Sequence, residues 1–181
     1  MVSFPGGLMI RYARPTDAAS LASVAAATFP LACPPDTTPE SMADFIALHL
    51  AVANFDAYLA APDCELLVAE SHGVVSGYTM LVYAEPTDPD VLAAITVRPT
   101  AELSKCYVLA SSHGSGLATE LMAASVTAAR DRGAAGVWLG VNQQNAKANR
   151  FYEKNGFALV GTKRFLVGAR WEEDFVRELV L

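Results

Sequence analysis

The sequence predicts one mixed α/β domain over residues 1–181, and three observations support this prediction. Strand-like segments follow one another through the middle of the chain and then alternate with helix-like segments. Hydrophobic residues make up 52% of the 181 residues and charged residues 18%, a balance typical of a globular protein with a sizeable core. The sequence contains neither internal repeats nor a linker long enough to separate two domains.

The N-terminal third of the chain predicts one strand and at least one pair of helices. Leu8 to Ala13 has the composition of a first strand, and Thr16 or Asp17 is placed to cap the helix that follows. Phe29 to Pro39 contains four prolines, which predicts a loop because proline disrupts a helix. Apolar residues recur at helical spacing from about residue 40, and helix or irregular chain continues to residue 62.

Three strand-like segments occupy the middle of the chain. Glu65 to Ser71 and Val74 to Tyr83 have β-rich compositions, and the His72-Gly73 pair between them predicts a two-residue hairpin turn. Residues 85–100 begin with a turn-rich break and fit no single element. Glu102 to Ala110 is the next predicted strand.

The C-terminal third of the chain alternates helix and strand. Helices are predicted over Leu117 to Arg132 and over Asn145 to Asn155. The strand between them, Gly136 to Asn142, lacks polar alternation, as expected of a strand that is covered on both faces. Two further strand-like segments, Phe157 to Val167 and Phe175 to Leu181, finish the chain.

The charge and the cysteines exclude several classes of protein. The formal net charge is −6, whereas proteins that bind nucleic acid usually carry a basic surface. Cys33, Cys64 and Cys106 match no zinc-binding spacing and cannot all pair within one chain, so we expect free thiols in a reducing compartment and no metal. The sequence shows no signal peptide and no apolar run of about 18 residues, which together predict a cytoplasmic protein without a membrane partner.

The strand over residues 102–110 leads into a glycine-containing turn, SSHGSGLAT, that opens a helix. A turn of this kind directs several free backbone N–H groups at one point, where a phosphate can bind beside the positive end of the helix. The turn lacks the Gly-Lys-Ser/Thr ending of a P-loop, and Thr119 stands where a Rossmann fingerprint requires its third glycine. The turn therefore predicts a phosphate site of another kind.

The helix after the next strand carries a second pattern, in which asparagine, alanine, two aromatic residues, lysine and a Gly-Phe pair follow one another at fixed spacing. These residues are Asn145, Ala148, Phe151, Tyr152, Lys154, Gly156 and Phe157. Together with the turn, which has His113 where Gln or Arg is usual, this pattern resembles the GNAT superfamily of N-acetyltransferases. The segments ELSKCYVLASSHGSGLA, WLGVN and VGTKRFLVG are similar to the branch that contains spermidine/spermine acetyltransferase-like proteins.

The resemblance implies a single GNAT-type domain over residues 1–181. Its α/β fold would have a central, mixed and mostly antiparallel sheet of six to seven strands, flanked by about four helices. The resemblance also implies acetyl-CoA as the co-substrate, and no metal. The residues that it implies for cofactor binding lie in the strand, the turn and the second helix: Val108, Ala110, His113, Gly114, Ser115, Gly116, Leu117, Ala118, Thr119, Asn145 and Tyr152.

Two side chains are candidates for catalysis. In relatives, the residue that matches Tyr152 protonates the departing thiolate, and a phenol with a reference pKa of about 10 is protonated at neutral pH. The backbone N–H of Val108 is the candidate donor to the oxyanion. Glu102 lies 11 residues before His113, where several acetyltransferases place a general base. A solvated surface glutamate is an equally good interpretation of Glu102.

The sequence thus predicts transfer of an acetyl group from acetyl-CoA to a primary amine of a small molecule, by direct attack in a ternary complex. A polyamine is one candidate acceptor, and a peptide or protein amine is the alternative. A catalytically weak acyl-CoA-binding module and a structural protein that uses the scaffold alone are further alternatives. Apolar strand edges are compatible with a homodimer.

Overall fold

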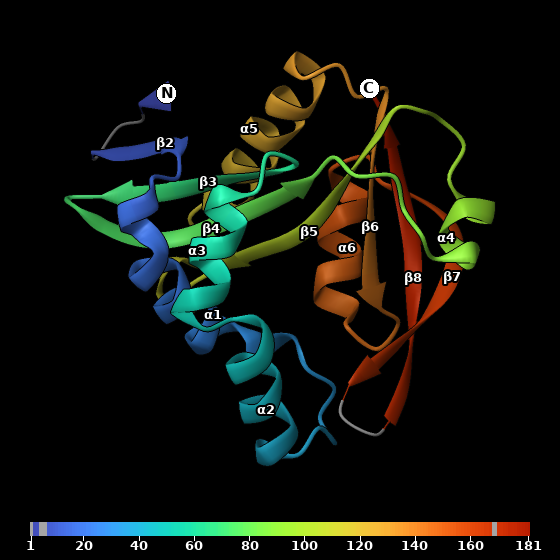
Figure 1. Ribbon diagram of the computed structural model, residues 1–181, viewed down its shortest axis with the longest axis horizontal. Coiled ribbons are helices and arrows are strands. Elements are labelled where there is room, and N and C mark those ends of the chain that lie inside the picture. Colours follow the sequence, from blue (N-terminus) through green and yellow to red (C-terminus); the bar gives the residue numbers. More distant parts are fainter. Residues whose placement is uncertain (1, 4–6, 168–169) are drawn as a thin grey trace.

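The strands of the protein form one mixed sheet. The computed structural model describes residues 2–3, 7–167 and 170–181, and its eight strands lie in the order β1-β2-β3-β4-β5-β6-β8-β7 (Figure 1). Neighbouring strands are antiparallel except β5 and β6, which are parallel. The strands are β1 (Val2–Ser3), β2 (Leu8–Tyr12), β3 (Cys64–Ser71), β4 (Val74–Val82), β5 (Thr100–Val108), β6 (Gly136–Asn142), β7 (Ala158–Val167) and β8 (Arg170–Val180). The mixed, mostly antiparallel sheet is confirmed, since β1 adds only two residues to seven longer strands.

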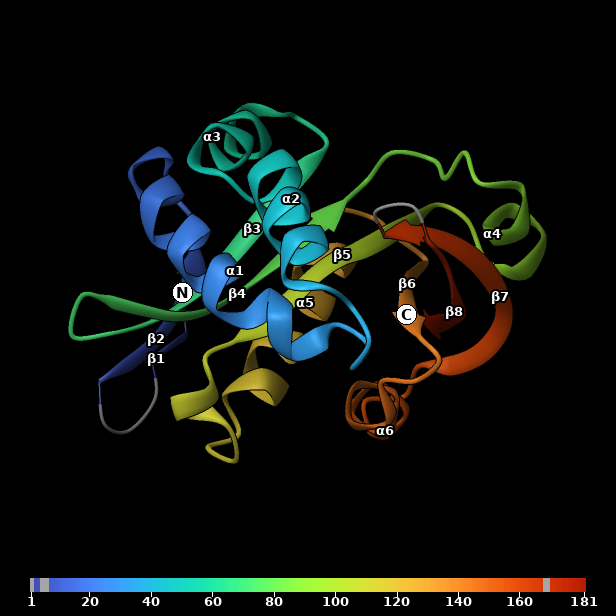
Figure 2. The same ribbon diagram turned by 90° about the horizontal axis from the view of Figure 1, so that it is seen from below.

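Helices cover both faces of this sheet. Figure 2 shows α5 and α6 on one face and α1, α2 and α3 on the other, and each face has its own buried core. The helices are α1 (Ala18–Ala32), α2 (Pro39–His49), α3 (Val52–Ala60), α4 (Pro89–Ala94), α5 (Leu117–Asp131) and α6 (Ala146–Lys154), with 3-10 turns η1 (Pro15–Asp17) and η2 (Ala110–Ser112). The described chain exceeds the expected four α-helices because residues 39–60 form two helices and residues 85–100 contain the short α4.

The first helix continues through a proline, so the predicted loop from Phe29 was wrong at its start. Pro30 lies in the last turn of α1, which ends two residues later. Phe29 is buried, and its ring stacks on Phe45 of α2 with 4.4 Å between ring centroids. Packing between these two rings therefore favours the helix at a position where proline alone predicts a break.

The helices α2 and α3 together form an apolar stretch, Pro39–Ala60, whose length and mean hydropathy of 1.2 fit a membrane span. The helical conformation is interrupted at Leu50 and Ala51, so that α2 has 11 residues and α3 has 9. A helix that spans a bilayer requires about 20 residues. Leu50 and Phe55 are fully buried in the core on this face of the sheet. The break thus divides the stretch into two short helices, and the domain core holds Leu50 at the break and Phe55 of α3.

The parallel strands β5 and β6 pair over only three residues. Residues 100–102 pair with residues 136–138, and the two strands then diverge (Figure 1). Beyond that point the described chain pairs β5 with β4 and β6 with β8. A bulge opposite Met80 and Leu81 leaves Ser104 of β5 without a partner residue. Because a bulge bends the strand that contains it, β5 turns away from β6 and keeps an open edge.

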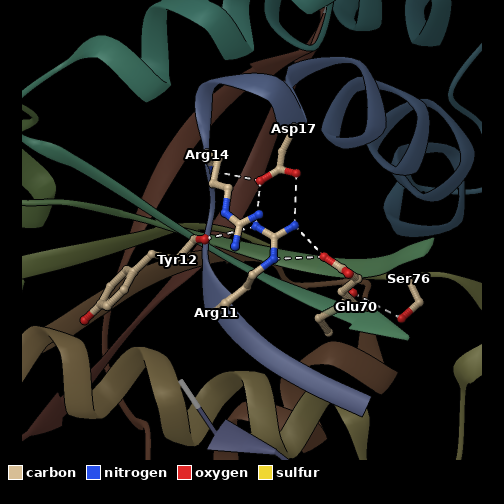
Figure 3. Close-up of polar contacts among 7 residues, drawn as sticks. Arg11, Tyr12, Arg14, Asp17, Glu70 and Ser76 are labelled. Atoms are coloured by element: carbon tan, nitrogen blue, oxygen red, sulfur yellow. Dashed lines mark hydrogen bonds and ion pairs between the residues drawn. The ribbon is translucent and has the colours of Figure 1, made fainter. Parts of the chain in front are cut away.

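A buried arginine joins β2 to the two elements beside it. Figure 3 shows the Arg11 guanidinium between the carboxylates of Asp17 and Glu70. Its Nη1 donates to Asp17 Oδ2 at 2.7 Å, and its Nε donates to Glu70 Oε2 at 2.8 Å. The hydrogen bond from Arg11 lowers the pKa of Asp17, which also accepts the N–H of Arg14 at the start of η1. One cation therefore holds the entrance to α1 against β2 and β3.

Replacing Arg11 with methionine should lower the free energy of unfolding by about 3–5 kcal/mol, because two largely buried carboxylates lose their counter-charge. Denaturant unfolding monitored by circular dichroism measures this loss. Arg14→Met, which removes an exposed side chain, is the matched control and should change the free energy by less than about 1 kcal/mol. An equally small loss for Arg11→Met would contradict the structural role of this network.

Candidate active site

The open edge of β5 forms one wall of a cleft of about 460 Å³. The end of α1, the turn before α5 and the first turns of α6 form its other walls. Most of the predicted site residues line this cleft: Val108, His113, Gly114, Gly116, Leu117, Ala118, Thr119, Asn145 and Tyr152. Ala110, Ser115 and Glu102 do not line it. The structure therefore brings the two sequence patterns together at one place.

The turn before α5 leaves three backbone N–H groups free. Gly114 and Gly116 have φ angles of +80° and +86°, and a Cβ at either position would meet nothing within 4 Å. Backbone conformation, rather than space, requires glycine here. Within the described chain, the N–H groups of Gly114, Gly116 and Ala118 donate to no protein acceptor. Free N–H groups at the positive end of α5 form a site for an anion.

His113 connects the turn to both neighbouring walls of the cleft. Its Nε2 lies 3.1 Å from the carbonyl oxygen of Val108 in β5, and its Nδ1 lies 3.1 Å from Nζ of Lys147 in α6. A carbonyl can only accept a hydrogen bond and an ammonium can only donate one. Nε2 therefore carries the ring hydrogen and Nδ1 accepts, so the imidazole is neutral and both of its nitrogens are occupied.

Backbone groups of β5 point into the cleft. The N–H of Leu109 donates to the carbonyl of Ser76 at 2.8 Å, which makes these two residues a hydrogen-bonded pair across β4 and β5. Hydrogen-bonded and non-hydrogen-bonded pairs alternate along antiparallel strands, so Val108 and Cys106 direct their N–H and C=O groups away from β4. Since β6 has diverged at this point, these groups face the cleft.

The structure places Ala110 outside this open edge. The predicted strand included Ala110, but β5 ends at Val108 and Ala110 begins the turn η2. Its side chain is exposed, and its carbonyl accepts the N–H of His113 at 3.1 Å. The residue that shares the orientation of Val108 is Cys106, which the sequence interpretation missed. Counting back two residues along the strand would have identified it.

The cysteines of the described chain are free thiols, as expected. Cys106 lines the cleft, and burial raises the pKa of its thiol to about 12. Because the thiolate is the nucleophilic form, this side chain is unreactive at neutral pH. Cys106 therefore contributes its backbone and its packing to the cleft.

The helix α6 brings Asn145 and Tyr152 to the cleft. Asn145 caps the helix, since its Oδ1 accepts the N–H of Ala148 at 3.0 Å. The Tyr152 ring packs against Phe151 and Phe157, with centroid distances of 5.5 and 6.0 Å. Burial raises the pKa of Tyr152 well above its usual range. The phenol is therefore protonated at neutral pH and can donate a hydrogen bond into the cleft.

Glu102 lies where β5 and β6 begin to diverge. Ala101 and Leu103 on either side face the core beneath α5, so the Glu102 side chain lies on the opposite face of the sheet. The residue is half-buried, and burial raises the pKa of its carboxyl while Lys163 and Lys105 lower it. This environment differs from that of a solvated surface glutamate.

A second charged group lies on the same face, beyond β6. Lys163 of β7 places its Nζ 4.0 Å from Oδ2 of the buried Asp174 in β8. The Lys163 side chain passes over Gly140 of β6, where a Cβ would lie 2.6 Å from Lys163 Cε. Burial raises the pKa of Asp174 to about 6, an effect that Lys163 opposes and Glu172 reinforces. Sequence reasoning missed this group because its members come from different strands and form no local pattern.

The sequence has relatives over most of its length. A family model described as the acetyltransferase (GNAT) family matches residues 26–157. An uncharacterised N-acetyltransferase of Mycobacterium tuberculosis (strain H37Rv) is 46% identical over 167 residues, which cover 91% of this chain and 99% of that protein.

Solved structures share the fold. The PaiA N-acetyltransferase of Thermoplasma acidophilum, in complex with coenzyme A, has a TM-score of 0.77 and 18% identity over 96% of this chain and 99% of that one. The yncA protein of Salmonella typhimurium, with its cofactor acetyl-CoA, has a TM-score of 0.66 and 24% identity over 96% of this chain and 94% of that one. At these identities the likeness concerns the fold alone.

The raised pKa of Asp174 predicts a pH-dependent stability. A folded-state pKa of about 6 lies above the ordinary 3.8, so the folded protein binds this proton more tightly than the unfolded chain does. The carboxyl therefore lowers the free energy of unfolding as the pH rises from about 4 to about 6. Asp174→Asn should remove this decline, which amounts to about 1–3 kcal/mol. Denaturant titrations between pH 4 and 7 measure it, with the exposed Glu173→Gln as control, and parallel profiles for wild type and Asp174→Asn would contradict it.

Proposed function

The chain belongs to the acetyltransferase (GNAT) family, and on that premise we propose that it transfers an acetyl group from acetyl-CoA to a primary amine. The observation that supports this function most directly is the content of a single cleft. A turn with free N–H groups, an open strand edge and a protonated tyrosine meet there. Each of the three matches a different part of the reaction.

The cleft fits coenzyme A at two places. The free N–H groups of Gly114, Gly116 and Ala118 suit a pyrophosphate at the start of α5. The open edge of β5 offers the N–H and C=O groups of Cys106, which suit an amide of a pantetheine arm in the manner of an added strand. The N–H of Val108 is also open, whereas the Val108 carbonyl accepts from His113. Two solved structures that share the fold contain coenzyme A or acetyl-CoA, which supports the same ligand here.

The chain stabilises the charges that develop during the transfer. The reaction joins the amine nitrogen to the acetyl carbon and breaks the bond between that carbon and sulfur. The N–H of Val108 donates to the carbonyl oxygen, on which negative charge builds. Tyr152 donates a hydrogen bond to the departing sulfur. Because burial raises its pKa, the phenol acts more readily as a hydrogen-bond donor than as a source of a free proton.

Glu102 accepts the proton that the amine must lose. An amine with a reference pKa of about 10 is mostly protonated at pH 7 and cannot attack in that form. Burial raises the pKa of Glu102, which makes its carboxylate a stronger base than an exposed one. Since Glu102 does not line the cleft, the proton reaches it through water. The amine attacks acetyl-CoA directly within a ternary complex. Much of the rate comes from holding the two substrates together in that complex.

The acceptor is a small-molecule amine, with polyamines as one class. The net charge of −6 favours a cationic substrate. The carboxylates of Glu102, Glu172 and Asp174 on one face of the sheet also favour a cationic substrate. A peptide or protein amine is the alternative acceptor.

Binding of acyl-CoA without turnover is a second candidate function. One observation favours it, namely that Glu102 is not among the residues that line the cleft. The two functions differ in whether thiol release from acetyl-CoA depends on an amine.

Replacing Tyr152 with phenylalanine should lower amine-dependent thiol release by about a hundredfold, because the hydrogen bond to sulfur strengthens in the transition state. The dissociation constant of acetyl-CoA should stay within about twofold, since binding uses the turn and the edge of β5. Thiol release is measured against polyamines, amino acids, aminoglycosides and N-terminal peptides, and binding by calorimetry.

Tyr12→Phe is the matched control, since it removes a hydroxyl from a half-exposed tyrosine outside this cleft. Unchanged turnover in Tyr152→Phe would remove Tyr152 from the mechanism. Acetyl-CoA binding without release on any amine would favour the binding module.

A further inference from the structure

The cleft contains one permanent positive charge. Of the described residues that line it, Lys147 is the only lysine or arginine, and none is acidic. The other walls are mostly apolar or carry hydroxyl and amide groups. An anionic ligand in this cleft would therefore meet a single full counter-charge.

Lys147 lies directly opposite the turn that opens α5. It is the second residue of α6, its side chain is exposed, and its Nζ lies 3.1 Å from Nδ1 of His113. His113 immediately precedes Gly114, the first residue of the turn with a free N–H. The ammonium of Lys147 thus contacts the residue next to the anion site, although Lys147 comes from a helix about 30 positions later in the sequence.

His113 cannot supply this charge in the arrangement observed. Its Nε2–H is donated to the Val108 carbonyl and its Nδ1 accepts from Lys147, so the ring is neutral. Either nitrogen could bind a phosphate only after it had lost one of these contacts. Lys147 uses one of its three N–H groups on His113 and keeps donors for an anion.

We propose that Lys147 binds the pyrophosphate of coenzyme A, and that His113 is a positioning residue that fixes the turn to β5 and holds Lys147 beside it. This proposal rests on the proposed function. It assigns the positive charge to Lys147 of α6, whose side chain reaches the turn at His113. The ammonium then acts together with the free N–H groups of Gly114, Gly116 and Ala118, which contribute only partial charge.

The proposal predicts which part of the ligand is recognised electrostatically. Dephospho-CoA keeps the pyrophosphate and lacks the 3′-phosphate, whereas pantetheine lacks both. Loss of the Lys147 charge should weaken the binding of coenzyme A and dephospho-CoA by the same factor. The binding of pantetheine should not change.

Calorimetric titration of the three ligands into wild type and Lys147→Met tests this prediction. We expect a loss of roughly tenfold in affinity for coenzyme A and for dephospho-CoA, the size of one charge-assisted hydrogen bond. Arg150→Met, which removes an exposed charge from the same helix outside the cleft, should stay within about twofold. Lys147→Arg, which keeps the charge, should recover most of the lost affinity.

Each other outcome overturns the proposal. Equal affinities in wild type and Lys147→Met would remove Lys147 from the site, and a loss confined to coenzyme A would assign the charge to the 3′-phosphate instead. An equal loss in Arg150→Met would mean that only the general charge of α6 matters. Failure of wild type to bind coenzyme A at all would refute the proposed function itself, which keeps the two failures distinguishable.

The positioning role of His113 has its own test. His113→Ala removes the donor to Val108 and should lower both coenzyme A affinity and kcat, because Val108 carries the proposed oxyanion donor. His113→Gln, which keeps an N–H donor, should restore kcat to within about threefold of wild type. A purely structural role would change thermal stability without this difference in kcat between His113→Ala and His113→Gln. An unchanged kcat in His113→Ala would overturn the assignment.

Discussion

The candidate active site exists because β5 diverges from β6. The two strands are held together over only three residues, and the bulge at Ser104 then turns β5 away. The N–H and C=O groups of a strand in the middle of a sheet normally form hydrogen bonds with both neighbouring strands. Here the backbone groups of Cys106 and the N–H of Val108 have no strand partner, because β6 has diverged and β4 bonds the alternate residues, while the Val108 carbonyl accepts from the His113 side chain. The cleft is the space that this divergence opens.

The two faces of the sheet are covered by separate cores. Residues of α5 and α6 pack on one face, and residues of α1 and α3 pack on the other. The Arg11 network fixes the start of α1 to β2 and β3, which places the end of α1 in the cleft wall. The contact from Val108 through His113 to Lys147 spans the open side, so β5 and α6 are connected there by side chains instead of strand pairing.

The sequence predicted those parts of the protein that local patterns determine. The bounds of β6 follow from an apolar run, and the structure places them as predicted. The helix predicted from Asn145 is also present, with Asn145 as its cap. The continuation of α1 past Pro30 could not be predicted, because the stacking of Phe29 on Phe45 is a contact between two helices. The contacts of Lys147 with His113 and of Lys163 with Asp174 could not be predicted either, because each joins residues from different elements.

Amide hydrogen exchange with and without acetyl-CoA measures whether the divergence of β5 from β6 leaves backbone groups free for the ligand. Saturating acetyl-CoA should slow exchange at Cys106 and Val108 in β5 and at Gly114, Gly116 and Ala118 in the turn. Exchange in β2 and β3, far from the cleft, should not change. Protection at β2 and β3 alone, or no protection at the five amides in a protein that binds acetyl-CoA, would show that the ligand does not use the open edge of β5 and the turn.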